Sequence, residues 1–140
     1  MKLEELEPLV GEWATEVELP GASGAIRGRT TFSWLEGGGY LIQRATMEDP
    51  NFPTGVMVIG PDLRGERVVQ HYFDSRGVAR VYDISLEDGV LRVWRDDSDF
   101  AQRYTGTFSA DGTTVSGAWE ICDDGETWAH DFALTYTKFR

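Results

Sequence analysis

The stretch that decides the fold is QRYTGTFSADGTTVSGAWEICDDGETWAHDFAL, residues 102–134. It contains three runs rich in aromatic and β-branched residues, and the dipeptides Asp111-Gly112 and Asp124-Gly125 separate them. Asp-Gly between two such runs favours a two-residue β-hairpin loop, because both loop residues then adopt a positive φ. Two hairpins that share their middle strand predict three adjacent antiparallel strands.

A two-residue loop also fixes which residues face each other across the hairpin. The loop at Asp111-Gly112 predicts that Tyr104 lies opposite Trp119 on one face. On the other face it places Arg103 opposite Glu120, which is an ordinary cross-strand ion pair. The apolar face is expected to point inward.

The loop at Asp124-Gly125 gives a second prediction for the same middle strand. It places His130 opposite Trp119 and again makes that face apolar. Tyr104, Trp119 and His130 are therefore expected in one inward row. Two interpretations of this row remain open, a wall of a ligand site or a packed aromatic row with a hydrogen-bonded histidine.

The rest of the chain supports an all-β fold. Residues 3–10 have helical apolar spacing and predict one short helix, and from Gly11 onward the apolar period is two. We expect an antiparallel up-and-down β-barrel of about ten strands, lipocalin-like, as a single domain over residues 1–140. The expected strands are 11–19, 27–36, 39–48, 54–60, 66–74, 78–87, 90–96, 99–110, 113–122 and 127–138.

The expected interior contains too many polar side chains for a solid core, because each buried polar group needs a partner. A ten-stranded barrel has room for a cavity. We therefore expect a binding module for a small, partly apolar molecule, which is anionic if Arg80 and Arg95 bind it. The alternative for these arginines is pairing with acids at the rim. The predicted ligand-binding residues are Trp34, Gln43, His71, Phe73, Arg80, Tyr82, Arg95, Gln102, Tyr104, Trp119, Phe132 and His130.

The orientation of His71 depends on one loop. With Arg76-Gly77 as a two-residue loop, His71 faces inward beside Tyr82. One extra loop residue turns it outward. An alternative function follows from the inward orientation, a small isomerase or hydrolase in which His71, Tyr82 and Arg80 are catalytic, with the imidazole as base.

Charge and composition exclude several classes of protein. The chain has 140 residues and a net charge of −11, so nucleic acid and anionic membrane surfaces are not expected partners. A single cysteine, Cys122, rules out a disulfide within the chain. The first residues, MKLEEL (1–6), do not resemble a secretion signal, and no apolar run reaches the ~18 residues of a membrane helix. These features together predict a cytoplasmic protein.

No sequence motif assigns an enzyme or a metal site. There is no phosphate-binding loop, dinucleotide fingerprint or Gly-x-Ser-x-Gly elbow. Two histidines and one cysteine are too few for an ordinary structural zinc site. An enzyme, a cofactor and a metal are therefore not expected. An assembly or interaction protein with a filled barrel remains an alternative, and an exposed apolar outer patch near Trp94 and Tyr72 would favour it. A second copy of the chain, in a homodimer, is the candidate protein partner.

The segment Gly11-Glu12-Trp13 resembles the Gly-x-Trp pattern on the first strand of lipocalins and the wider calycin superfamily. That resemblance implies that a basic residue near the chain end packs over the indole and closes the barrel. Arg140 and Lys138 are the candidates. The chain is also similar to a bacterial family of calycin-like domains of unknown function, through GVMVIG (55–60), HYFDSRG (71–77) and GAWE (117–120). Both resemblances imply the fold.

A looser resemblance is to nitrobindin, a ten-stranded haem barrel whose proximal histidine lies on the last strand. His130, in HDFAL (130–134), has a comparable position. The resemblance implies an alternative function, a haem-binding barrel with His130 as axial ligand.

Overall fold

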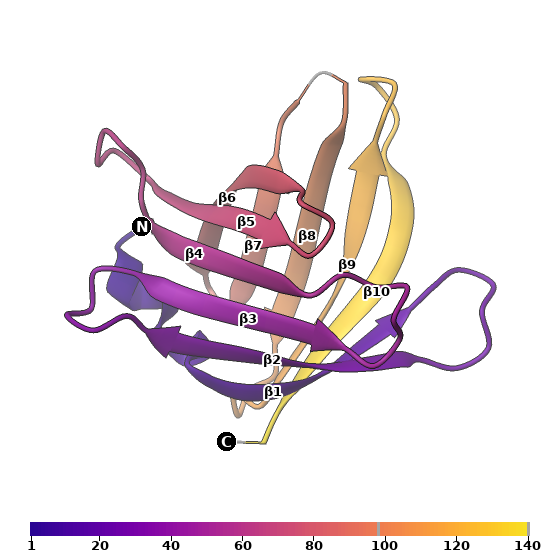
Figure 1. Cartoon of the computed structure of the whole chain (residues 1–140), viewed down its shortest axis with the longest axis horizontal. Coiled ribbons are helices and arrows are strands. Elements are labelled where there is room, and N and C mark those ends of the chain that lie inside the picture. The colour runs from indigo at the N-terminus through magenta and orange to yellow at the C-terminus, as the bar shows by residue number, and fades with distance from the viewer. Residues whose placement is uncertain (98, 140) are drawn as a thin grey trace.

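Ten antiparallel strands follow one another around a closed barrel in the computed structural model, which describes residues 1–97 and 99–139 (Figure 1). Every strand pairs with its neighbours in the chain, and β1 pairs with β10. The expected all-β, up-and-down barrel is confirmed. A short 3-10 helix, η1 (Leu3–Leu9), precedes the strands, and no helix of the described residues is long and apolar enough to cross a membrane. The strands are β1 (Gly11–Glu18), β2 (Ile26–Trp34), β3 (Leu41–Met47), β4 (Gly55–Pro61), β5 (Val68–Asp74), β6 (Ala79–Glu87), β7 (Val90–Arg95), β8 (Ala101–Phe108), β9 (Thr114–Cys122) and β10 (Ala129–Lys138).

Turn chemistry explains the registers that the sequence predicts correctly. Asp88 and Gly89 have φ values of 52° and 73°, as a tight hairpin turn requires. The loop at Asp111-Gly112 spans residues 110–113 instead of two residues, because the Ser109 amide donates to the Thr114 carbonyl. It keeps the predicted register, with Tyr104 opposite Trp119 and Arg103 opposite Glu120. The Arg103 Nε atom donates to Glu120 Oε1 at 2.8 Å, so the predicted outer ion pair is present.

Helix η1 covers one end of the barrel. Its residues Leu6 and Leu9 are fully buried, and the Trp13 indole N–H donates to the Leu9 carbonyl at 2.8 Å. The Trp34 indole N–H donates to Glu7 Oε2, also at this end. Trp34 therefore ties the barrel to its helix and does not line the cavity described below.

Trp13 is the centre of the closed end, with no exposed surface. Phe108 and Tyr136 pack edge-on against its ring, at centroid distances of 6.3 and 6.4 Å. The Lys138 ammonium lies 5.3 Å from the ring centroid, and Lys138 is the residue opposite Trp13 in the β1–β10 register. Lys138 thus occupies the position that the resemblance to calycins implies, whereas Arg140 lies outside the described residues.

Replacing the Trp13 side chain removes the largest fully buried ring. We expect Trp13→Ala to lower the free energy of unfolding by about 3–5 kcal/mol in chemical denaturation. Lys138→Met removes only the cation over the ring and is expected to cost about 0.5–1 kcal/mol. Trp128→Ala, on the outer surface against Arg103, is the matched control. A loss from Trp13→Ala no larger than the control's would contradict the role given to Trp13.

Candidate functional site: a cavity inside the barrel

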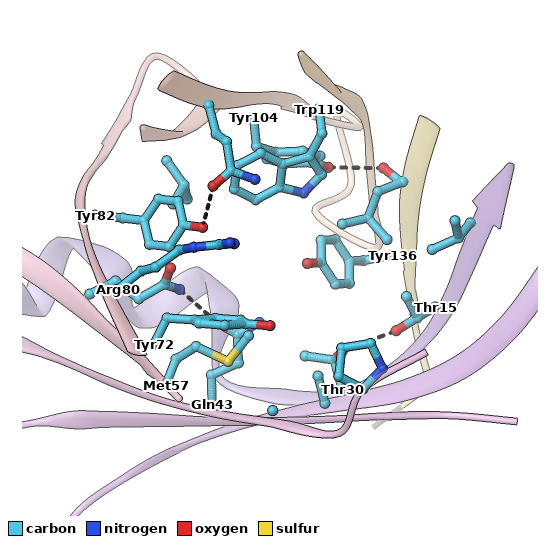
Figure 2. A pocket seen from close by; sticks show the side chains of 18 of the residues that line it. Thr15, Thr30, Gln43, Met57, Tyr72, Arg80, Tyr82, Tyr104, Trp119 and Tyr136 are labelled. Carbon is cyan, nitrogen blue, oxygen red and sulfur yellow. Dashed lines mark hydrogen bonds between the residues drawn. The ribbon is translucent and has the colours of Figure 1, made fainter. Parts of the chain in front are cut away.

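The barrel encloses a cavity of about 410 Å³ (Figure 2). Besides inward strand residues, three connections contribute to its lining: Phe52 and Pro53 after β3, Arg76 after β5, and Phe100 after β7. In an up-and-down barrel every second connection lies at the same end. These three connections therefore form the mouth, and η1, whose Leu9 also lines the cavity, lies at the opposite end.

Five aromatic side chains form a continuous series along the wall, which we call the aromatic arc: Tyr72, Tyr82, Trp119, Tyr104 and Tyr136. Successive ring centroids are 6.0, 5.8, 5.6 and 6.3 Å apart. Three of these contacts are edge-to-face, which is a favourable geometry for aromatic pairs. The arc presents both ring surface and hydroxyl groups to the interior (Figure 2).

Polar groups of the wall bond to one another. The Tyr82 hydroxyl donates to Gln102 Oε1 at 2.8 Å, and the Tyr104 hydroxyl donates to the Leu134 carbonyl at 3.0 Å. Among the described residues, no buried side-chain nitrogen or oxygen lacks a partner. The interior can therefore hold polar groups without a bound molecule. Two further pairs are Gln70 Nε2 to Gln43 Oε1 and the hydroxyls of Thr15 and Thr30.

Burial keeps the phenols of the arc neutral. It raises the pKa of Tyr72 to about 12, with a further rise from the hydrogen bond to Asp74, and it raises the pKa of Tyr136 to about 12. Burial also raises the pKa of Tyr104 well above the usual range. The pKa of Tyr82 is raised by burial too, although the charge of nearby arginines opposes that rise.

The two arginines that were predicted to bind a ligand, Arg80 and Arg95, have different environments from each other. Arg80 lines the cavity, and its guanidinium carbon lies 5.6 Å from the centroid of the Phe100 ring. Arg95 does not line it. Its guanidinium donates to the Phe100 carbonyl at 3.0 Å and to Asp97 at 3.2 Å. Arg95 thus bonds to residues of the β7–β8 connection, in agreement with the alternative that the arginines pair with acids at the rim.

A second polar cluster lies at the mouth. Asp74 Oδ2 accepts from the Tyr72 hydroxyl at 2.7 Å and from the Arg76 guanidinium at 2.6 and 3.1 Å. The hydrogen bonds from Arg76, with that from Tyr72, hold the pKa of Asp74 well below its usual range. The cluster fixes the connection between β5 and β6 beside the cavity.

The predicted inward orientation of His71 and Phe73 is wrong, and the β5–β6 loop is the reason. The loop has three residues, Ser75–Gly77, because the Asp74 amide donates to the Val78 carbonyl. Gly77, with φ 82°, supplies the left-handed conformation that such a loop requires. The third residue shifts the register by one. The cavity is lined by Gln70 and Tyr72 instead, so the catalytic alternative that needs His71 inside with Tyr82 and Arg80 does not form.

The predicted inward orientation of His130 is also wrong. A β-bulge lies between His130 and Phe132, and Phe132 rather than His130 is opposite Trp119. His130 is opposite Glu120 on the outer face and is exposed. The cause is the loop before it, which is longer than two residues: Ala129 is opposite Ile121, so His130 falls opposite Glu120, and the bulge after it returns Phe132 to the inner face. Asp124 Oδ1 accepts from the backbone amides of Glu126 and Thr127 within this loop.

The cavity does not fit a histidine-ligated haem. None of the residues that line it is a histidine or a cysteine. Over residues 1–97 and 99–139, there is also no cluster of three or more His, Cys, Asp or Glu residues that could hold a metal ion. The haem alternative with His130 as axial ligand therefore lacks its ligand.

The cavity thus combines predicted and unpredicted residues. Its predicted members are Gln43, Arg80, Tyr82, Gln102, Tyr104, Trp119 and Phe132. Tyr136 and Thr15 could have been found, because each continues a period-two pattern, with Leu134 and with Trp13 respectively. Gln70 and Tyr72 could not have been found in this way, because the assumed two-residue loop before β6 predicts that their neighbours His71 and Phe73 point inward.

Comparison with known proteins supports the fold. A solved structure, that of Rv2717c from M. tuberculosis, matches this chain with a TM-score of 0.65 and 15% sequence identity. The match covers 99% of this chain and 97% of Rv2717c, so the barrel fold is shared over the whole length. No family model matches the sequence, and no curated protein matches it.

Buried phenols give the site a measurable pH response. The neutral form of Tyr72 and Tyr136 is favoured in the folded protein, so this contribution to stability is complete below about pH 10 and is lost as the pH rises through about 12. In an absorbance titration of the folded protein, we expect most of the phenolate to form only above about pH 11. In urea, where the protein is unfolded, we expect the phenolate to form near pH 10. Titration of all tyrosines near pH 10 in the folded protein would contradict the buried arc.

Proposed function

We propose that this protein is a binding module that holds one small, partly apolar molecule inside its barrel. The observation that carries this proposal is the cavity of about 410 Å³ with a mouth at one end. Pockets for small molecules commonly measure about 300–1,000 Å³ and combine apolar walls with a few polar groups. The aromatic arc supplies such walls, and the amides and hydroxyls beside it supply the polar groups.

The wall chemistry favours a ligand with a flat or aliphatic body. Tyr104 and Trp119 offer large ring surfaces, and Phe132 and Leu134 add apolar surface on β10. The amides of Gln43 and Gln102 are held by hydrogen bonds to Gln70 and Tyr82. These prepositioned groups orient a bound molecule at a small entropic cost.

A variant that fills the cavity tests this proposal. Ala45 lines the cavity on β3, so Ala45→Phe should occupy space that a ligand needs. We expect the fluorescence enhancement of the neutral probe phenylnaphthylamine to be lost in Ala45→Phe and kept in Ala14→Phe. Ala14 is exposed on β1 and offers the same substitution on the outer face.

The stability of Ala45→Phe separates an open cavity from a packed core. Added volume in a packed core costs about 1–3 kcal/mol, whereas an open cavity accepts the ring at a smaller cost. We expect urea denaturation to show a loss below about 1 kcal/mol for Ala45→Phe. A larger loss, together with no probe binding by the unmodified protein, would overturn the binding function. A molecule retained during purification, identified by mass spectrometry of the unmodified protein under native conditions, would support the binding function.

A further inference from the structure

We propose that the ligand is an amphipathic anion, and that its carboxylate or other oxyanion head binds Arg80 just inside the mouth. The inference rests on the proposed binding function and specifies the chemistry of the ligand. Its apolar body would lie along the aromatic arc. The argument depends on what surrounds each of three arginines at this end of the barrel.

Arg80 differs from its two neighbours, each of which has an acidic partner. Arg76 bonds to Asp74 at 2.6 Å, and Arg95 bonds to Asp97 at 3.2 Å. Within the part of the chain that the structure describes, no carboxylate forms an ion pair with Arg80. A guanidinium that lines a largely apolar cavity without a counterion is a preferred binding group for an oxyanion.

The contacts of Arg80 are uncharged and leave donors free. Its guanidinium lies over the Phe100 ring and beside the Tyr82 hydroxyl. A guanidinium has five N–H donors in a planar fork, so these contacts do not exhaust it. Figure 2 shows the Arg80 side chain extending into the cavity between Tyr82 and Tyr72.

Acids on the adjacent strand do not neutralise Arg80. Asp74 follows Tyr72 by two residues on β5, and Tyr72 is the residue opposite Arg80. Its carboxylate already accepts hydrogen bonds from Tyr72, Arg76 and the backbone amides of Arg76 and Val78. The charge of Asp74 is therefore balanced within its own loop.

The charges around Tyr82 also favour an anion near Arg80. The guanidinium groups of Arg80, Arg95 and Arg76 all act to lower the pKa of the Tyr82 phenol, although burial raises it overall. Because Arg76 and Arg95 are paired with Asp74 and Asp97, Arg80 is the arginine at this end whose positive charge is not balanced by an ion pair among the described residues, in a chain whose net charge is −11. A local positive field in an acidic protein favours an anion at that place.

Two matched fluorescent probes test the inference, namely anilinonaphthalene sulfonate and the neutral phenylnaphthylamine, which has a similar ring system without the anion. We expect Arg80→Gln to weaken sulfonate binding by about tenfold or more, because a charge-assisted hydrogen bond is lost. Binding of the neutral probe should change by less than about twofold. Arg80→Lys keeps the charge and should retain part of the affinity.

A natural type of head group can be tested by competition. Decanoate should displace phenylnaphthylamine from the unmodified protein at a lower concentration than decanol does, and Arg80→Gln should remove that difference. Arg103→Gln, on the outer face, is the control and should change neither probe. Near-ultraviolet circular dichroism of each variant checks that the fold is kept.

The outcomes separate this inference from the function on which it rests. If the neutral probe binds and Ala45→Phe blocks it, but Arg80→Gln leaves both probes unchanged, the binding function stands and the anion inference is wrong. If neither probe binds inside the barrel, the binding function itself fails. Equal displacement by decanoate and decanol would also overturn the inference.

Discussion

The cavity depends on the pairing of the first strand with the last. β1 and β10 are held together by a ladder that runs from Trp13 opposite Lys138 to Glu18 opposite Ala133. This pairing removes the free edges that an open sheet would have, and it curves ten strands around an interior too wide for side chains to fill. Thr15 and Tyr136 meet across this seam and both line the cavity. The strand pairing that closes the sheet therefore also completes the wall of the site.

The polar groups of the interior are paired with one another or with the backbone along the wall. Gln43 bonds to Gln70, and Tyr104 bonds to a backbone carbonyl of β10. These bonds offset the cost of removing amides and hydroxyls from water. Arg80 is the exception, because its charge faces the cavity and its partners carry none. The wall therefore favours a negatively charged group at one place, beside Arg80, and elsewhere it offers apolar surface and neutral polar groups.

Period-two patterning and Asp-Gly turns predicted the number of strands, their approximate limits and the register of β8 with β9. Such turns are determined by local backbone preferences, so a short stretch of sequence contains the information. The orientations of His71 and His130 could not be obtained in this way. A third residue in the loop before β6 turns His71 outward, and an extra residue in the loop before β10 turns His130 outward. The bulge that follows His130 adds one more residue and returns Phe132 to the inside. The bulge places Phe132 opposite Trp119 in the cavity wall, and no turn dipeptide in the sequence marks its position.

The bulge in β10 has a consequence for how such a barrel can change. Inside and outside alternate along a strand, so an added residue inverts that assignment for every position between itself and the nearest flexible connection. Here that interval is short, because residues 123–128 take up the offset. If the extra residue moved from the bulge into the connection at 123–128, β10 would alternate regularly, and His130, two positions before the inward Phe132, would face the lumen while the wall from Phe132 onward stayed in place. The side of the barrel that His130 faces is thus determined by where one residue of chain length is accommodated, without any substitution among the residues that line the interior.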